Sequence, residues 1–271
     1  MLPQLLDFDN IDVWAINLDK ILYPLITDST IKKIRESKFK YIEDSQDLLF
    51  KLTNRDQIIN AVIEWICSNK IVGYHGTRIT KVEIDSIRKN GLLSLNAIDR
   101  VSRLTRVLSS HPEWDDIKNK LNDTIQSHGK GNYSGRREGQ AHLTLSKSSL
   151  TNWFNHYISY GSEFDQRVVV ELLGEEGKDL LAKDGISKVI KFSIPGNLAL
   201  KAAHPIGSLE QKIQNGEVPN LVNQFIKAWS CRIVNSNFQS SDLCIDCGMV
   251  FLDTIPPEWI VEIKTITLPS T

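Results

Sequence analysis

The stretch Val72-Gly73-Tyr74-His75-Gly76-Thr77-Arg78 determines how we interpret the whole chain. The apolar residues at its start predict the end of a strand, and the polar residues after them predict a turn. Residues 82–89 then form an expected amphipathic helix, which ends at Asn90-Gly91, where glycine suits the left-handed conformation of a C-cap. We therefore expect His75 where a strand leaves the sheet, a usual place for a ligand-facing side chain.

The composition is that of an ordinary globular protein. The chain has 271 residues, of which 41% are hydrophobic, enough for one large domain or two small ones. No apolar run approaches the roughly 20 residues that span a membrane. Residues 1–10 lack the basic start and apolar stretch of a signal peptide, so we expect a cytoplasmic protein without a membrane partner. The formal net charge of -1 argues against a globally basic surface for nucleic acid and leaves room for a local basic patch.

The chain contains four cysteines, and two of them, Cys244 and Cys247, have the CxxC spacing of zinc and redox sites. No second CxxC pair and no nearby pair of histidines completes a ligand set. Free cysteines are commonly buried, so we expect ordinary buried thiols and no metal.

Residues 1–70 show the periodicity of helices, and we expect them to form an N-terminal helical lobe. Such a lobe either covers one side of the protein or docks a partner or substrate. Residues 96–140 form an expected insertion that begins with Arg100, Arg103 and Arg106 at helical spacing and contains a polar, glycine-rich loop at 127–139. Its local excess of positive charge suits either a phosphate-bearing substrate or nucleic acid, or simply a solvated loop.

The second half of the chain mixes expected strands and helices. Residues 141–145 alternate, which predicts a strand with His142 and Thr144 on its polar edge. A helix should follow from the serines at 146–149 to about residue 159, with an aromatic face formed by Trp153, His156, Tyr157 and Tyr160. We expect strands at 167–173, 188–194, 243–252 and 259–268, and helices at 209–213 and 222–229. Because strands and helices do not alternate regularly, we predict an α+β fold with mixed or antiparallel sheets.

Three segments, in order, resemble motifs of the ADP-ribosyltransferase superfamily, in particular the branch that contains the tRNA 2'-phosphotransferases. Residues 74–77, Tyr-His-Gly-Thr, with the helix after them resemble the first motif, and residues 141–148 resemble the second. Residues 247–260 resemble the third, which in polymerase-type members begins with a catalytic glutamate. This chain has Gly248 or Met249 at that place. The likeness covers residues 71–265.

The resemblance implies an ADP-ribosyltransferase-like split mixed β-sandwich flanked by helices, in a catalytic domain at 71–271. NAD, as a substrate, would lie in a cleft between two small sheets. The residues expected to bind NAD are Tyr74, His75, Gly76, Thr77, Arg78, Thr144, Ser148, Trp153, Tyr157 and Tyr160. Of these, Gly76 would hold the carboxamide, Arg78 the pyrophosphate, and one of the three aromatic residues the nicotinamide ring.

His75, His142 and Glu163 are the expected catalytic residues. His75, with Thr77, would bind a ribose, and His142 a hydroxyl or a phosphate. Because the third-motif glutamate is missing, a base must come from elsewhere. Glu163 is our first choice, and Asp165, Glu171 and Asp246 are alternatives that the sequence does not separate.

The function that follows is transfer of ADP-ribose from NAD to a macromolecular acceptor, protein or nucleic acid. By analogy alone, such an enzyme suits a bacterial toxin or a phage-defence effector. The missing glutamate keeps two alternatives open. One is removal of an RNA 2'-phosphate, since a phosphate needs no base to attack NAD. The other is a non-catalytic module that binds NAD or ADP-ribose.

Overall fold

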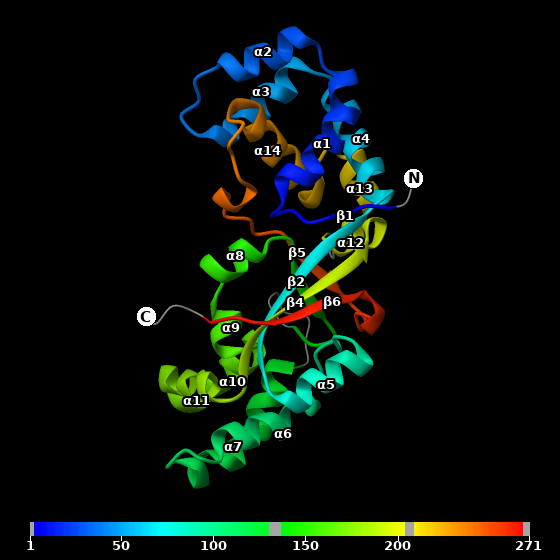
Figure 1. The fold of residues 1–271 in the computed structure, drawn as a ribbon. Coiled ribbons are helices and arrows are strands. Elements are labelled where there is room, and N and C mark those ends of the chain that lie inside the picture. The colour runs from blue at the N-terminus through cyan, green and yellow to red at the C-terminus, as the bar shows by residue number, and fades with distance from the viewer. Residues whose placement is uncertain (1–2, 130–136, 204–208, 268–271) are drawn as a thin grey trace. The chain divides into compact units, whose positions relative to one another are not determined.

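The computed structural model describes residues 3–129, 137–203 and 209–267 (Figure 1). The chain divides into two compact units. Unit 1 consists of Met1–Gly73, Thr144–Ser149 and Ser193–Met249, and unit 2 of Tyr74–Leu143, Leu150–Phe192 and Val250–Thr271. The division expected at residue 70 lies close to the first boundary, but the N-terminal helices share their unit with two later segments of the chain.

The described strands belong to one sheet, where two small sheets were expected. These strands are β1 (Leu5–Leu6), β2 (Lys70–Ile79), β3 (Ala141–Thr144), β4 (Ile186–Pro195), β5 (Gly248–Phe251) and β6 (Ile260–Thr265). The sheet has the order β5-β3-β2-β4-β6, and β1 pairs with β2 in parallel. Strands β4 and β6 are antiparallel. Helices and strands are therefore mixed within one fold, which is compatible with the predicted α+β class.

Strand β2 is longer than we expected. The predicted turn at residues 74–78 is wrong, because the strand continues to Ile79 and His75 lies in its middle. Gly76 lies within the strand. The Leu150 side chain packs closely against it, because an added Cβ at Gly76 would lie only 2.9 Å from that side chain. Helix α5 (Lys81–Asn90) follows as predicted. It starts with a capping box formed by Thr80 and Glu83 and ends at Gly91, whose φ is 81°.

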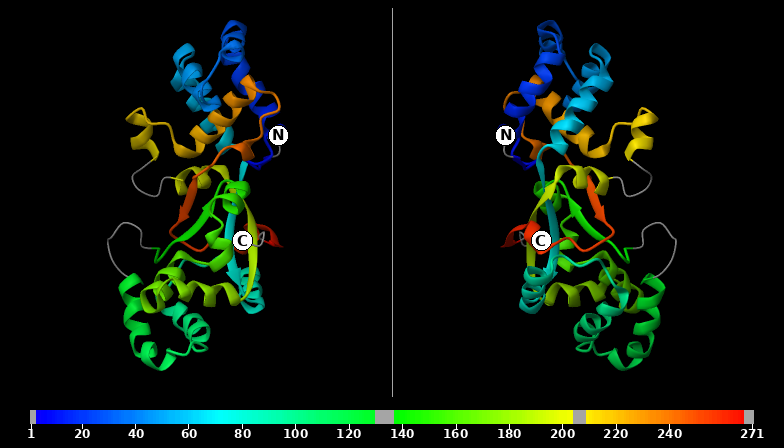
Figure 2. Two further views of the ribbon diagram at one scale, coloured as in Figure 1. Left: turned by 90° about the vertical axis from the view of Figure 1, so that its left-hand side faces the viewer. Right: turned by 90° about the vertical axis from the view of Figure 1, so that its right-hand side faces the viewer.

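Unit 1 is built mainly from helices, as expected for the first 70 residues. They are α1 (Ile11–Leu22), α2 (Asp28–Glu36), α3 (Ser45–Leu52), α4 (Arg55–Cys67), α12 (Gly196–Ala202), α13 (Leu209–Gln214) and α14 (Asn220–Val234). Helix α14 packs against α1, α2, α3 and α4 (Figure 2). The aromatic rings of Phe8, Trp14, Trp65 and Phe225 contact one another at the centre of this core, with ring centroids 5.0–6.2 Å apart.

Unit 2 carries a second helical core, formed by α6 (Ala97–Leu108), α7 (Trp114–Gly129), α10 (Glu163–Leu173) and α11 (Gly177–Lys183) (Figure 1). The strand predicted at 167–173 is wrong, because these residues belong to α10. Ser162 caps this helix, Gly174 follows its last residue with a φ of 69°, and Val168 and Val169 are buried against the neighbouring helices. The caps and this burial outweigh the strand preference of consecutive valines.

The helix predicted to run to about residue 159 is interrupted. It consists of two short helices, α8 (Lys147–Asn152) and α9 (His156–Tyr160). Trp153 lies between them and is 63% exposed, so the expected continuous aromatic face does not form. The loop expected at 127–139 also differs in part. Residues 127–129 belong to α7, and residues 130–136 lie outside the described part of the chain.

The cysteines agree only in part with our expectation. Cys231 and Cys247 are buried, whereas Cys67 and Cys244 are exposed. The strand predicted at 243–252 begins only at Gly248, so Cys244 lies in a non-strand segment before it. Within residues 3–129, 137–203 and 209–267, no group of three His, Cys, Asp or Glu residues could hold a metal ion. No helix among the same residues has the length and apolar character of a membrane span.

Candidate functional site

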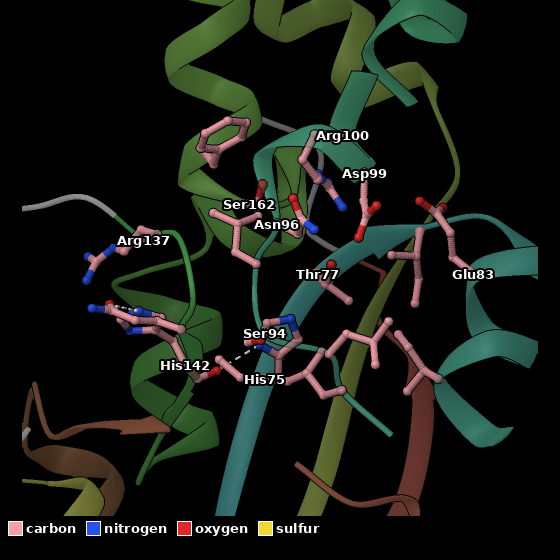
Figure 3. Close-up of a pocket in the computed structure, with 18 of the residues that line it drawn as sticks. His75, Thr77, Glu83, Ser94, Asn96, Asp99, Arg100, Arg137, His142 and Ser162 are labelled. Carbon is pink, nitrogen blue, oxygen red and sulfur yellow. Dashed lines mark hydrogen bonds between the residues drawn. The ribbon is translucent and has the colours of Figure 1, made fainter. Parts of the chain in front are cut away.

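Unit 2 contains a pocket of about 270 Å³ that is bounded by β2, α5, α6, β3, α9 and α10 (Figure 3). Apolar side chains such as Ile87, Leu92 and Phe164 form much of its wall. The polar residues that line it are His75, Thr77, Arg78, Glu83, Ser86, Ser94, Asn96, Asp99, Arg100, Arg137, Gln140, His142, Tyr157, Ser162 and Glu163. An apolar cleft with a few convergent polar groups is the usual form of a small-molecule site.

The two histidines predicted from separate motifs lie together in this pocket. His75 Nδ1 is 2.8 Å from the backbone carbonyl oxygen of His142, as the dashed line in Figure 3 marks. A carbonyl only accepts, so Nδ1 of His75 carries the proton and donates it. His142 Nε2 is 2.9 Å from Gln140 Oε1, and by the same reasoning Nε2 is the protonated nitrogen there. Each neutral ring thus keeps one nitrogen, His75 Nε2 and His142 Nδ1, as an acceptor.

Both imidazoles are held in the neutral form. Burial lowers the pKa of His75, although its bond to the His142 carbonyl works in the opposite direction. Burial, together with the positive charge of Arg137, lowers the pKa of His142 to about 4. Among the described residues, none donates a hydrogen bond to either free ring nitrogen. The pocket therefore presents two acceptors suited to hydroxyl groups of a ligand.

The depressed pKa of His142 makes the stability of the protein depend on pH. An unfolded histidine titrates near pH 6.5, so between about pH 6.5 and 4 the unfolded chain binds a proton that folded His142 does not. The contribution of His142 to the free energy of unfolding is therefore complete above pH 6.5. It decreases as the pH falls, by up to about 1.4 kcal/mol for each pH unit. Urea unfolding at several pH values should show this slope in the wild type and a smaller slope in His142→Gln. Equal slopes would contradict the neutral state of His142.

The alternation of β2 divides the residues of the first motif between two faces. His75 and Thr77 share the face that lines the pocket, and Figure 3 shows both side chains there. The other face of β2 carries the side chains of Tyr74 and Arg78, and a side chain at Gly76 would project from it too. Arg78 lines the pocket as well, and its guanidinium donates from Nη1 to Ser187 Oγ at 2.9 Å. One end of the Arg78 guanidinium is therefore engaged by Ser187, and its contact with a pyrophosphate stays a prediction.

Glu163 lines the pocket at the start of α10 and is held by several donors. Arg137 donates to its Oε2 from Nε at 3.0 Å and from Nη2 at 2.9 Å, and the Tyr157 hydroxyl donates to Oε1. His156, Tyr157 and Arg137 hold the pKa of Glu163 well below its usual range, despite partial burial. A carboxylate this acidic accepts a proton poorly, so the structure favours Glu163 as an anchor for Arg137 and Tyr157 over a role as general base.

The three arginines of α6 do not offer free charge to a substrate. Arg100 pairs with the buried carboxylate of Asp165 through two hydrogen bonds. Arg103 is 5% exposed and donates to Glu83 Oε1 at 2.6 Å and to the Arg78 carbonyl at 2.8 Å. Arg106 pairs with Asp184 at 2.9 Å. These charges form a network that ties α5, α6 and α10 together, so these three arginines are already paired within the protein.

Several other predicted residues do not line the pocket. Tyr74 is buried on the opposite face of β2, Trp153 is exposed, and Tyr160 packs against the helical core of unit 2. Thr144 and Ser148 belong to unit 1, where the backbone N–H groups of Lys147 and Ser148 donate to Asp9. Of the alternative bases, Asp165 is paired with Arg100, Glu171 is 2.7 Å from His128, and Asp246 is an exposed residue of unit 1.

The sequence interpretation missed some of the polar lining, notably Glu83, Asn96, Arg137 and Gln140. A signal existed for two of them. Thr80 and Glu83 have the spacing of a capping box, and Asn96 has the chemistry of an N-cap before the periodic residues of α6. Nothing local marks Arg137 or Gln140, which reach the pocket only through the fold.

Comparison of the chain with protein-family models, with curated proteins and with solved structures finds no match.

Proposed function

We propose that this protein is an NAD-dependent ADP-ribosyltransferase that transfers ADP-ribose to a protein or a nucleic acid. The observation that carries the proposal is that His75 and His142, 67 residues apart in the sequence, lie in one pocket and are joined by a hydrogen bond between the neighbouring strands β2 and β3. These residues come from the first and second of the three segments that resemble motifs of the superfamily. The accompanying fold proposal is that the sheet and its flanking helices form an ADP-ribosyltransferase-like core.

The pocket residues suit parts of a nicotinamide dinucleotide. NAD supplies the glycosidic bond between ribose and nicotinamide that breaks when ADP-ribose is transferred. His75 Nε2 and His142 Nδ1 are acceptors for ribose hydroxyls, and Thr77 adds a hydroxyl on the same face. The apolar wall excludes water from the groups that it covers, which strengthens these hydrogen bonds. The cavity volume of about 270 Å³ holds only part of a dinucleotide, so the rest of NAD would lie at the entrance of the pocket.

Arg137 is the residue best placed to bind a phosphate of NAD. Its Nε and Nη2 donate to Glu163, which fixes the guanidinium and leaves Nη1 for a ligand. It lies on the same side of the pocket as His142, whose pKa it lowers (Figure 3). Glu163 accordingly serves as a positioning residue. This proposal assigns to Arg137 a phosphate contact of the kind that the family resemblance implied for Arg78.

Replacing Arg137 with glutamine should raise the KM for NAD by about tenfold or more, because a charge-assisted hydrogen bond is lost. The effect on kcat should be smaller, since the phosphates are held alike before and during the reaction. Steady-state kinetics of nicotinamide release measures both constants. Arg88→Gln is the matched control, because Arg88 is an exposed arginine of α5 that pairs with Asp85 outside the pocket. An unchanged KM in Arg137→Gln would contradict the assignment.

The test of the proposed function is release of nicotinamide from NAD by the purified protein. Cell lysate, DNA and RNA are offered separately as acceptors, with NAD labelled in its adenylate part. We expect free nicotinamide together with label on one acceptor class. Binding of NAD without release under all conditions would reject transfer and favour a non-catalytic binding module.

One observation favours a second candidate, the removal of an RNA 2'-phosphate. Two of the three carboxylates that line the pocket, Glu83 and Glu163, pair with arginines, and the pKa of each is lowered, so neither is a good base and Asp99 is the remaining carboxylate. For Glu83, burial opposes this shift, while Arg103 and Thr80 produce it. A phosphate acceptor is already nucleophilic and needs no base. Turnover that requires 2'-phosphorylated RNA would select this candidate.

A further inference from the structure

A second cavity, of about 360 Å³, lies wholly within unit 1. It is lined by Tyr23, Arg35, Arg232, Ile233, Val234 and Ser236. Tyr23 belongs to the short 3-10 helix η1 (Tyr23–Leu25), Arg35 to the last turn of α2, and Arg232 to the last turn of α14. Segments distant in the sequence therefore bring two guanidinium groups and one phenol to the same cavity.

The cavity has an excess of positive charge. Arg35 is exposed and forms no ion pair with any residue that the structure describes. Arg232 has a single long contact, 3.4 Å from Nη1 to Asp19 Oδ2, and its buried Nε has no hydrogen-bond partner among the described residues. Asp19 also accepts a hydrogen bond from the Trp229 indole at 2.8 Å. Among the described residues, Asp19 is thus the acidic partner of Arg232 and is shared with Trp229, and the cavity is lined by two guanidinium groups and no carboxylate.

A buried N–H without a partner costs free energy, so the unpaired Nε of Arg232 calls for an acceptor. Tyr23 adds a further donor. Burial and the nearby Asp19 raise the pKa of Tyr23, more than Arg35 and Arg232 lower it, so its hydroxyl keeps its proton at neutral pH. The Tyr23 ring is fixed against Trp229, with centroids 6.0 Å apart. The polar groups that face the cavity are mainly donors.

We infer that this cavity binds the phosphate group of a small phosphorylated ligand. Guanidinium groups match phosphate oxygens in both charge and geometry, and the Tyr23 hydroxyl supplies one more donor. The volume exceeds that of a phosphate alone, and the apolar residues Ile233 and Val234 offer a wall for the organic part of the ligand. The site is separate from the pocket of unit 2 and does not depend on the function proposed for that pocket.

The test is calorimetric titration of the full chain with inorganic phosphate and with glycerol 3-phosphate, and with acetate as the carboxylate comparison. Arg35→Gln is the main variant, because Arg35 is exposed and its loss should not disturb folding. Lys33→Gln is the matched control, since Lys33 is an exposed cation on the same helix that does not line the cavity. Tyr23→Phe removes only the hydroxyl. Arg137→Gln removes the cation of the other pocket.

We expect glycerol 3-phosphate to bind more tightly than phosphate and far more tightly than acetate. Arg35→Gln and Tyr23→Phe should each weaken binding, the first by about tenfold, because a charged hydrogen-bond donor is lost. Lys33→Gln and Arg137→Gln should leave binding unchanged. No saturable binding, equal binding by Arg35→Gln and Lys33→Gln, or loss of binding in Arg137→Gln would each overturn the inference. Acetate binding as tight as phosphate binding would also overturn it.

Discussion

Replacing His75 with asparagine should abolish nicotinamide release while leaving the fold intact. The asparagine amide nitrogen takes a position close to that of Nδ1, so it can still donate to the His142 carbonyl, 2.8 Å from Nδ1 in the native protein. The acceptor at Nε2 disappears. Loss of one preorganised hydrogen-bonding group in an active site typically costs about 100-fold or more in rate. We therefore expect a fall of at least about 100-fold in kcat/KM.

The variants His75→Asn and His75→Ala distinguish loss of a ligand contact from loss of stability. His75→Ala removes both the donor and the acceptor, so it should lose activity and also lower the melting temperature. His128→Asn is the control, because His128 lies on α7, pairs with Glu171 and does not line the pocket. Thermal unfolding and nicotinamide release are measured for all three. Full activity in His75→Asn, with a native melting temperature, would show that His75 serves only to join two strands.

The largest loss of stability is expected from Arg103→Met. Arg103 is nearly buried and lies within hydrogen-bonding or ion-pair distance of Glu83, Asp165 and the Arg78 carbonyl. Asp165 is fully buried and would keep only Arg100 as a charged partner. Removing one member of a buried ion network leaves part of the buried negative charge uncompensated and costs about 3–5 kcal/mol. Urea unfolding should show this decrease in the free energy of unfolding.

Arg106→Met provides the comparison for Arg103→Met. Arg106 lies one turn along the same helix and pairs with Asp184, but its side chain is 48% exposed. Exposed ion pairs contribute about 0–1 kcal/mol, so this variant should remain close to the wild type. A similar small effect for both variants would mean that water or rearrangement compensates the buried carboxylates, and that the network does not hold α5, α6 and α10 together.

Much of the secondary structure could be predicted from local patterns. The helix at 82–89 with its end at Gly91, the strand carrying His142, and helices within residues 1–70 all appear in the structure. In each case a capping residue or a clear periodicity marks the element. These signals depend only on nearby residues, which is why the sequence contains them.

The failures arise where tertiary contacts decide. Residues 167–173 carry three consecutive valines, yet they form a helix because two of the valines pack into the core formed with α7 and α11. Gly76 was taken as part of a turn, but it lies inside β2, where Leu150 and Ile158 cover it. Neither partner is near in the sequence, so propensity alone points the wrong way.

The positions of the two histidines in the candidate site could be predicted from the sequence, but the pairing of its charged residues could not. His75 and His142 could be found from their motifs, and their strands carry them into one pocket. The electrostatic roles could not be found, because they depend on partners from other elements. Arg78 is engaged by Ser187 and the α6 arginines by acidic residues, whereas Arg137 is fixed by Glu163 with one nitrogen remaining. A charge in a sequence does not reveal which charges neutralise it.

The discontinuity of unit 1 delays the folding of the N-terminal helices during synthesis. Asp19 accepts its hydrogen bond from Trp229, Ser45 donates to Ser230, and the Phe8 carbonyl is bonded by Ser240. All three partners lie roughly two hundred residues later in the chain, so the ribosome must make most of the protein before the first core closes. Until then Trp14 and Phe8 lack the Phe225 ring that contacts them in the finished core, and their apolar surface stays uncovered.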